Sequence, residues 1–292
     1  MSPRDMNPMR PDPENTIGKH EFDAIRQLLR SRTGIVLGAG KEYFVELRLG
    51  ALAIEEGFGT VSKLIDAFHT EEPWGVLHRR VVETLAISET SFFRDLHPFD
   101  ELRRTILPEL IARRSEERRL DVWCAACSSG QEPYSLAMLM RESFPMLGVW
   151  NVNLLATDFS NAMLRRSREG LYSQIEVNRG LPAPCLVRHF TKDGHEWRVR
   201  DWIKQMVEFK ELNLIQPWPA LPPMDIVFLR NVLIYFDGEA RRQVLRSLLR
   251  VLKPDGWLFL GGGETTLVLD ETFEAVSLGR VVAYRARIES AA

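Results

Sequence analysis

Apolar residues recur at helical spacing in the first part of the chain. Between His20 and Arg80 they fall three or four positions apart, which places them on one face of each helix. The clearest sets are Phe22, Ile25, Leu28 and Leu29, and Val61, Leu64, Ile65 and Phe68. Glycines separate these stretches. The pattern predicts an all-α N-terminal domain over residues 17–82, and this periodicity by itself points to no chemistry.

The second half alternates between short apolar runs and amphipathic stretches, which is typical of a βαβ sheet. Candidate strands are Asp121–Cys124, Val152–Thr157, Met206–Leu212, Asp225–Leu229, Trp257–Leu260 and Val281–Arg287. Candidate helices are Glu132–Phe144, Asn161–Glu169 and Glu239–Leu252. Between residues 182 and 213 the alternation breaks, and Arg188–Thr191 and Glu196–Arg200 flank a Lys-Asp-Gly-His turn. We therefore expect an α/β domain over residues 83–292, with a small antiparallel β-subdomain inserted at about 183–212.

Residues Leu120–Ser135 form the junction around which this second half is organised. An apolar run gives way to small residues, which let the backbone approach a ligand, and then to a helix. Ser128 or Ser129 is expected to cap that helix, with Pro133 in its first turn. Ligands bind at the carboxyl ends of such strands, although an ordinary βα turn has the same composition. A G-x-G-x-x-G run is absent, which disfavours NAD and favours a nucleoside cofactor.

Polar residues follow two further predicted strands. Asp158 ends the second strand, where an acidic residue either accepts hydrogen bonds from ribose hydroxyls or caps the next helix. Arg230 and Asn231 follow the fourth strand, and Tyr235 lies four positions beyond Asn231. Methyltransferases that act on the nitrogens of bases and amides carry an Asn/Asp-Pro-Pro-Tyr at this place, and this sequence lacks the prolines.

Composition narrows the class of protein further. The chain has 292 residues, a net charge of −2 and no apolar run near the ~20 residues of a membrane span, and its N-terminus lacks a signal-peptide core. We therefore expect a cytoplasmic protein that neither inserts into membranes nor binds nucleic acid. Residues 1–16 are rich in proline and are predicted to be disordered. Cys124 and Cys127 form a C-x-x-C without a second pair or a nearby histidine, so no metal site is expected.

Taken together, the motifs resemble one family, the CheR-type chemotaxis receptor (methyl-accepting protein) glutamate O-methyltransferases. The resemblance covers about residues 20–288. Its matching pieces are Ser88-Glu-Thr-Ser-Phe-Phe-Arg94, Ser128-Ser-Gly-Gln-Glu-Pro-Tyr-Ser135, Ala156-Thr-Asp158, Arg230-Asn-Val-Leu-Ile-Tyr-Phe236 and Leu252-Lys-Pro-Asp-Gly256. It implies a class I (Rossmann-like) methyltransferase sheet with an all-α N-terminal domain and an inserted β-subdomain. It also implies methyl transfer from S-adenosylmethionine to receptor glutamates, which leaves S-adenosylhomocysteine and tunes receptor adaptation.

The resemblance also implies a set of site residues. Arg94 and Tyr235 would be the catalytic pair, with Arg94 steering the carboxylate and Tyr235 orienting the donor or acceptor. Asp158 would bind the ribose and Glu132 the ammonium group of the cofactor. The full set of implied cofactor contacts is Ser88, Thr90, Arg94, Glu132, Asp158, Asn213, Leu214, Arg230 and Asn231. The run Gly261-Gly-Gly-Glu264 replaces a Gly-His-Ser-Glu of the family, and we do not expect it to touch these contacts.

The implied partner is the cytoplasmic helical region of methyl-accepting receptors. In the family the second N-terminal helix is strongly basic, whereas here Lys41 and Arg48 are mixed with acidic residues at positions 42, 46, 55 and 56. Whether this helix docks on a receptor is left open. The hairpin turn of the insertion is short, so we expect no binding of a receptor tether peptide.

A glutamate acceptor is ionised at neutral pH, with a pKa of about 4.3, so its methylation needs no general base. Two other functions stay open. A class I methyltransferase of RNA or a small molecule is disfavoured by the net charge and the missing Pro-Pro-Tyr. A non-catalytic module that binds S-adenosylmethionine or a nucleotide is disfavoured by the presence of both Arg94 and Tyr235.

Overall fold

The computed structural model describes residues 15–72, 74–264 and 272–287. Its two compact units divide the chain after Ile87. The predicted disorder of residues 1–16 falls almost entirely outside the described residues. Helix α4 (Val76–Leu85) continues beyond residue 82, where the sequence placed the boundary, so the first unit is slightly longer than expected.

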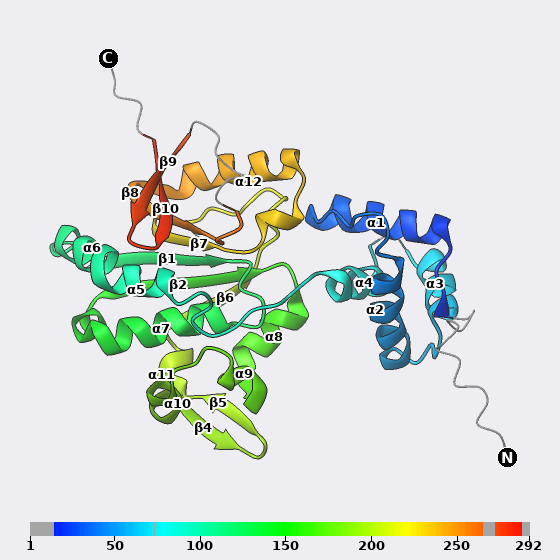
Figure 1. Cartoon of the computed structure of the whole chain (residues 1–292), viewed down its shortest axis with the longest axis horizontal. Coiled ribbons are helices and arrows are strands. Elements are labelled where there is room, and N and C mark those ends of the chain that lie inside the picture. The colour runs from blue at the N-terminus through cyan, green and yellow to red at the C-terminus, as the bar shows by residue number, and fades with distance from the viewer. Residues whose placement is uncertain (1–14, 73, 265–271, 288–292) are drawn as a thin grey trace, which may run out of the picture. The chain divides into compact units, whose positions relative to one another are not determined.

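The first unit is all helical, and its described helices are α1 (Lys19–Thr33), α2 (Glu42–Glu55), α3 (Val61–Thr70) and α4 (Figure 1). Each helix buries one apolar face, as with Phe22, Ile25 and Leu29 of α1. Helix α1 ends at Gly34, which has the left-handed conformation that glycine adopts without strain. The helical periodicity of the sequence therefore identified this core correctly.

The second unit is built on a seven-stranded sheet. Its order is β6 (Val207–Glu211), β2 (Asn151–Asp158), β1 (Arg119–Ala125), β7 (Met224–Leu229), β8 (Leu252–Leu260), β10 (Val281–Ala286) and β9 (Phe273–Leu278). The first five strands in this order are parallel, and β10 is antiparallel to both of its neighbours. All six predicted strands are present. Strand β9 was not predicted.

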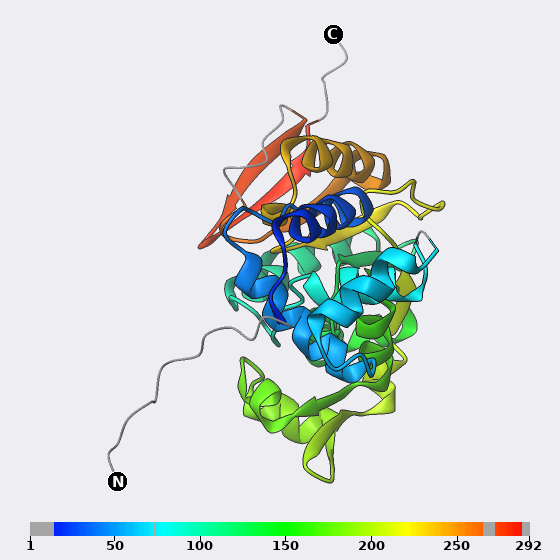
Figure 2. The same cartoon turned by 90° about the vertical axis from the view of Figure 1, so that its right-hand side faces the viewer.

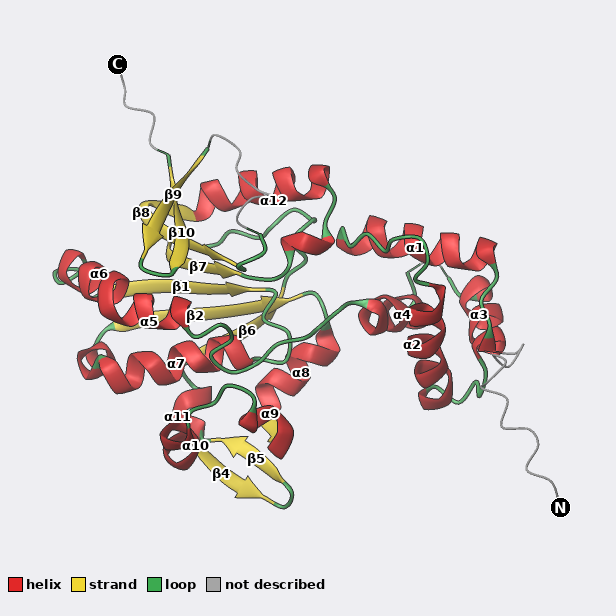
Figure 3. Ribbon diagram, in the orientation of Figure 1, coloured by secondary structure: helices red, strands yellow, loops and turns green. Residues whose placement is uncertain are grey.

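Helices cover the sheet on both sides. Before β1 the chain forms α5 (His97–Glu101), a π-helical turn (Leu102–Ile106) and α6 (Leu107–Arg113). The later helices are α7 (Gln131–Ser143), α8 (Asn161–Glu169) and α12 (Gly238–Val251), with 3₁₀ turns at Pro145–Val149 and Leu233–Tyr235. Figures 1 and 3 show α12 on the opposite side of the strands from α7. Residues of β7 are buried throughout, as expected for a parallel strand that is covered on both faces.

A second, three-stranded antiparallel sheet confirms the predicted insertion. Its order is β3 (Leu171–Ser173), β5 (Glu196–Val199) and β4 (Phe190–Asp193). The short helices α9 (Gln174–Asn178), α10 (Ala183–His189) and α11 (Asp201–Lys204) accompany it. Within this unit the small sheet lies far from α12 in both views (Figures 1 and 2). The insertion begins earlier than expected, because β3 pairs with β5 and so belongs to the small sheet. The first hairpin strand starts at Phe190 and not at Arg188, because residues 188 and 189 form the end of α10.

Candidate functional site

The order of the strands reverses beside β1. Strand β2 follows β1 in the chain and pairs with one edge of it, whereas β7 comes much later and pairs with the other edge. Ligands of open α/β sheets bind at such a switch point, beyond the carboxyl ends of the strands. The residues that follow β1, β2 and β7 therefore define the candidate site.

The turn between β1 and α7 is tightly wound. Ala126, Ser128 and Gly130 all have positive φ, at 56°, 51° and 93°. A Cβ added to Gly130 would lie 3.0 Å from the Ser167 Cβ and 3.1 Å from the Tyr172 hydroxyl, so a side chain does not fit there. The backbone of the turn therefore packs closely against α8 and the strand β3 of the small sheet.

The predicted cap of α7 by Ser128 or Ser129 is wrong. Gly130 is the N-cap, and its left-handed backbone replaces the extended conformation that a capping serine requires. The Ser128 hydroxyl instead donates to the Ser88 carbonyl oxygen at 2.7 Å, and the Ser129 hydroxyl donates to Gln131 Oε1 at 2.8 Å. The first of these bonds ties the segment that begins at Ser88 to the candidate site.

Asp158 is buried and holds two turns together. Its Oδ2 accepts from the Ser128 backbone N–H at 2.8 Å, and its Oδ1 accepts from the Ser160 N–H at 2.9 Å. Helix α8 is capped by the Ser160 hydroxyl, which accepts from the Met163 N–H. Asp158 is therefore not the cap. A carboxylate has about four acceptor positions, so Asp158 is able to accept more hydrogen bonds than these two.

Asn213 and Leu214 lie at the same edge of the sheet as Asp158. They come just after β6, which pairs with β2, and the intervening Leu212 donates its N–H to the Asp158 carbonyl oxygen at 3.0 Å. Thr90 is half-buried in the segment between Ser88 and Arg94. Among the described residues the Thr90 side chain makes no hydrogen bond, so the structure does not tie it to the other predicted contacts.

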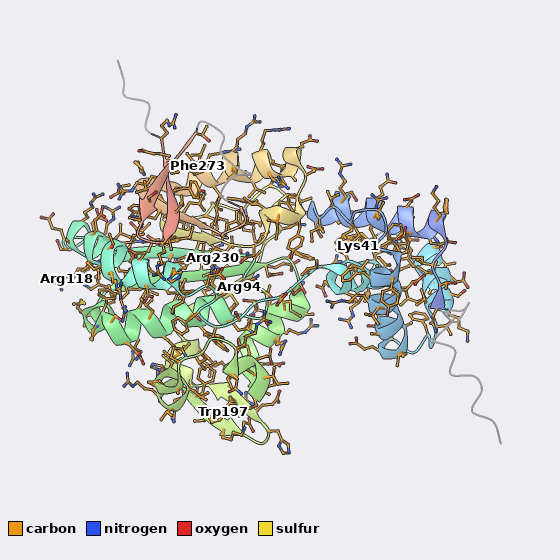
Figure 4. All side chains as sticks on the ribbon, in the orientation of Figure 1. Lys41, Arg94, Arg118, Trp197, Arg230 and Phe273 are labelled. Atoms are coloured by element: carbon orange, nitrogen blue, oxygen red, sulfur yellow. The ribbon has the colours of Figure 1, made fainter. Side chains whose placement is uncertain are left out.

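A buried arginine, Arg230, joins two other predicted residues, Glu132 and Arg94, to Asp95. Arg230 Nη1 donates to Glu132 Oε2 at 2.8 Å, and Nη2 donates to Asp95 Oδ2 at 2.6 Å and to the Arg94 carbonyl oxygen at 3.0 Å. Figure 4 shows Arg94 and Arg230 close together at this edge of the sheet. Burial raises the pKa of Glu132, and the positive charges of Arg230 and Arg94 only partly offset it.

The Arg94 guanidinium lies near enough to Tyr235 to influence the ionisation of its hydroxyl. Burial raises the pKa of Tyr235, and the Arg94 guanidinium opposes this rise. Tyr235 is therefore a neutral hydroxyl at pH 7. The backbone around Arg94 is strained, because Phe93, Asp95 and Leu96 all have positive φ. The Arg94 side chain is held by a hydrogen bond from Nη1 to the Glu89 carbonyl oxygen at 2.9 Å.

The residues predicted from the sequence did not include Glu264, which belongs to the site. Its carboxylate is fully buried and accepts from the backbone N–H groups of Asn231 and Val232, both at 2.8 Å. The expectation that the Gly261-Gly-Gly-Glu264 run would not touch the predicted contacts is therefore wrong. The available signal was an acidic residue at the end of a buried strand, directly after three glycines.

The chain matches two family models, described as the CheR methyltransferase SAM-binding domain, over residues 88–282, and the CheR methyltransferase all-alpha domain, over residues 20–83. The chain belongs to the CheR methyltransferase family. It is an S-adenosylmethionine-dependent methyltransferase with a class I fold, as predicted.

Curated relatives are similar along almost their whole length. Chemotaxis protein methyltransferase 1 of Pseudomonas aeruginosa is 39% identical over 91% of this chain and 98% of its own. Chemotaxis protein methyltransferase Cher2 of Pseudomonas putida is 36% identical over 92% of this chain and 99% of its own. The chemotaxis protein methyltransferase of Vibrio parahaemolyticus is also 36% identical, over 92% of this chain and 98% of its own.

The residues at the switch point fit S-adenosylmethionine. Two buried polar atoms, Arg230 Nε and Asn231 Oδ1, have no hydrogen-bond partner in the described part of the chain, which suits a polar ligand. Glu132 Oε1 also accepts no hydrogen bond from the described residues. Nothing in the described ranges groups three His, Cys, Asp or Glu side chains as a metal site would. Of the helices that the structure describes, none has the length and apolar character needed to cross a membrane.

Proposed function

We propose that this chain methylates glutamate side chains of chemotaxis receptors and so tunes receptor adaptation. The observation that carries this function is that a member of the CheR methyltransferase family places a cation, Arg94, near enough to a neutral hydroxyl, Tyr235, to influence its pKa. Two carboxylates, Glu89 and Glu264, act electrostatically on Tyr235, and neither is suited to be a general base. The pKa of Glu89 is lowered by Arg179, and the Glu264 carboxylate accepts hydrogen bonds from backbone N–H groups. An acceptor that is already ionised at pH 7 suits a site of this kind, because it needs no base.

Each predicted cofactor contact has a role in this proposal. Asp158 accepts hydrogen bonds from the ribose hydroxyls, and Glu132, through Oε1, accepts one from the ammonium group. Arg230 and Asn231 use their Nε and Oδ1 atoms, to which no described residue is hydrogen-bonded. The remaining contacts in the proposal are Ser88, Thr90, Arg94, Asn213 and Leu214.

S-adenosylmethionine, when bound, supplies a methyl group on a positively charged sulfur. The work of the chain is then to align the incoming carboxylate with that methyl group. The Arg94 guanidinium attracts the carboxylate, and the Tyr235 hydroxyl orients it. Holding the reacting atoms about 3–3.5 Å apart and excluding water supplies most of the rate in such a displacement.

The partner that we propose is the cytoplasmic helical region of methyl-accepting receptors, which implies a cytoplasmic enzyme. Arg80 pairs with Glu55 at 2.6 Å and with Glu56 at 2.8 Å, which offsets part of the acidic charge at the end of α2. Lys41 and Arg48 nevertheless remain among Glu42 and Glu46, and they form no continuous basic face. We propose no tether-peptide binding, because only two residues connect β4 to β5.

A carboxyl methyl ester can be recognised by its lability to base. Label from S-adenosyl-[methyl-³H]methionine, transferred to receptor-bearing membranes, should be released as volatile methanol on brief alkaline treatment. Membranes incubated with heat-denatured enzyme give the background. Alkali-stable label would contradict the glutamate ester and support methylation of nitrogen. Tight cofactor binding without any protein-bound label would support the non-catalytic module.

A further inference from the structure

The loop that follows β7 is held by a residue with no assigned role. Glu264 Oε2 accepts from the N–H groups of Gly261 at 2.6 Å and Asn231 at 2.8 Å. Its Oε1 accepts from the N–H groups of Val232 at 2.8 Å and Ile234 at 3.3 Å. These four bonds fill the acceptor positions of the carboxylate. Glu264 therefore has no lone pair left for substrate or cofactor, and it can act only through the loop.

The loop contains a residue in the left-handed conformation. Asn231 has a φ of 60°, which is uncommon for a residue with a side chain, although asparagine adopts it more often than most. The 3₁₀ turn Leu233–Tyr235 follows, and the Tyr235 N–H donates to the Val232 carbonyl oxygen at 3.0 Å. The Glu264 carboxylate thus holds both Asn231, whose buried Oδ1 accepts no hydrogen bond from the described residues, and the turn that carries the Tyr235 hydroxyl.

Gly261 is the second part of this arrangement. A Cβ at this position would lie 2.6 Å from Asn231 Nδ2, 2.8 Å from Glu264 Oε2 and 2.9 Å from the Asn231 backbone nitrogen. The loop and the end of β8 are therefore packed too closely to admit any side chain. This packing keeps the carboxylate away from water, which strengthens its bonds to the N–H groups.

We propose that Glu264 is a positioning residue for methyl transfer, because its buried carboxylate holds Asn231 and Tyr235 toward the cofactor. The proposal rests on the cofactor placement described under Proposed function. The negative charge of Glu264 also raises the pKa of Tyr235 and of Glu132, which agrees with its location beside both groups.

Glu264→Gln tests the proposal, because the amide keeps the shape of the carboxylate but replaces one of its oxygens with an NH2 group. That NH2 group cannot accept hydrogen bonds from the backbone N–H groups that it would face. We expect the Kd for S-adenosylhomocysteine, measured by calorimetry, to rise at least tenfold, and kcat for methyl transfer to fall as well. Asp225→Asn is the matched control. Asp225 is also fully buried and accepts a backbone N–H, from Asp121 at 2.9 Å, but it lies near the amino ends of the strands. That variant should lose thermal stability and keep the wild-type Kd.

Gly261→Ala approaches the same loop from the other side and should raise the same Kd, although it keeps the carboxylate. A Kd within twofold of wild type in a folded Glu264→Gln variant would overturn the positioning role. Failure of both loop variants to fold would also overturn it, since Glu264 would then serve the fold alone. Failure of the wild-type chain to bind S-adenosylhomocysteine is a different result, because it would overturn the cofactor placement itself.

Discussion

Asp158→Ala separates the two tasks of one buried carboxylate. In the structure Asp158 accepts the backbone N–H groups of Ser128 and Ser160, and we propose that it also accepts the ribose hydroxyls. Removing it leaves two buried donors unpaired, at about 1–3 kcal/mol each, so the free energy of unfolding should fall by about 2–6 kcal/mol. In a unit of this size 1 kcal/mol lowers Tm by roughly 2–4 °C, which gives a loss on the order of 10 °C.

Cofactor affinity should fall separately from stability. Hydrogen bonds to a charged group contribute roughly 1.5–3 kcal/mol each, so the Kd for S-adenosylhomocysteine should rise at least about tenfold. Calorimetry well below the Tm of the variant measures this Kd. Ser160→Ala is the matched control, because it removes the cap of α8 in the same turn and leaves the carboxylate in place. If Asp158→Ala lowers Tm but keeps the wild-type Kd, Asp158 holds the turns and does not bind the ribose.

Two further predictions concern turnover and docking. Arg94→Ala should lower the methyl-transfer rate sharply and Tyr235→Phe more moderately, with little change in S-adenosylhomocysteine Kd, because both act at the reacting centre; wild-type rates in both variants would place that centre elsewhere. Receptor association should depend only weakly on salt, because Lys41 and Arg48, at the start of α2 and within it, are mixed with acidic residues. Sedimentation with receptor membranes measures this association, and a steep loss of binding between low and physiological salt would contradict the prediction.

The central strands could be predicted because the sequence signal is local and strong. Strands β1 and β7 are mostly apolar, with one buried aspartate near the start of each, and small or polar residues follow each strand at once. Strand β9 could not be predicted in this way, because its apolar and polar residues do not alternate regularly and only Phe273 of its six residues is fully buried. The three-residue strand β3 is too short to show any period, and it exists because β5 pairs with it.

The site itself depends on contacts between residues far apart in the sequence. Arg230 meets Glu132 across 98 positions and Asp95 across 135, and Glu264 meets Asn231 across 33. Local patterns do not specify such pairs. The family resemblance supplied Glu132, Arg230 and Asn231 as cofactor contacts, but it gave no reason to join them to Asp95 or Glu264.

The strained residues show why these distant contacts are needed. Ser128, Asn231 and Asp95 have φ values of 51°, 60° and 65°, a conformation for which a sequence normally places glycine. Such residues cost about 1–3 kcal/mol each and persist only when their surroundings fix them. A charged side chain from elsewhere in the chain bonds each one: Asp158 the Ser128 N–H, Glu264 the Asn231 N–H, and Arg230 the Asp95 carboxylate. These three side chains, contributed by β2, the end of β8 and the end of β7, therefore hold the strained turns at the single edge where the methyl donor is proposed to bind.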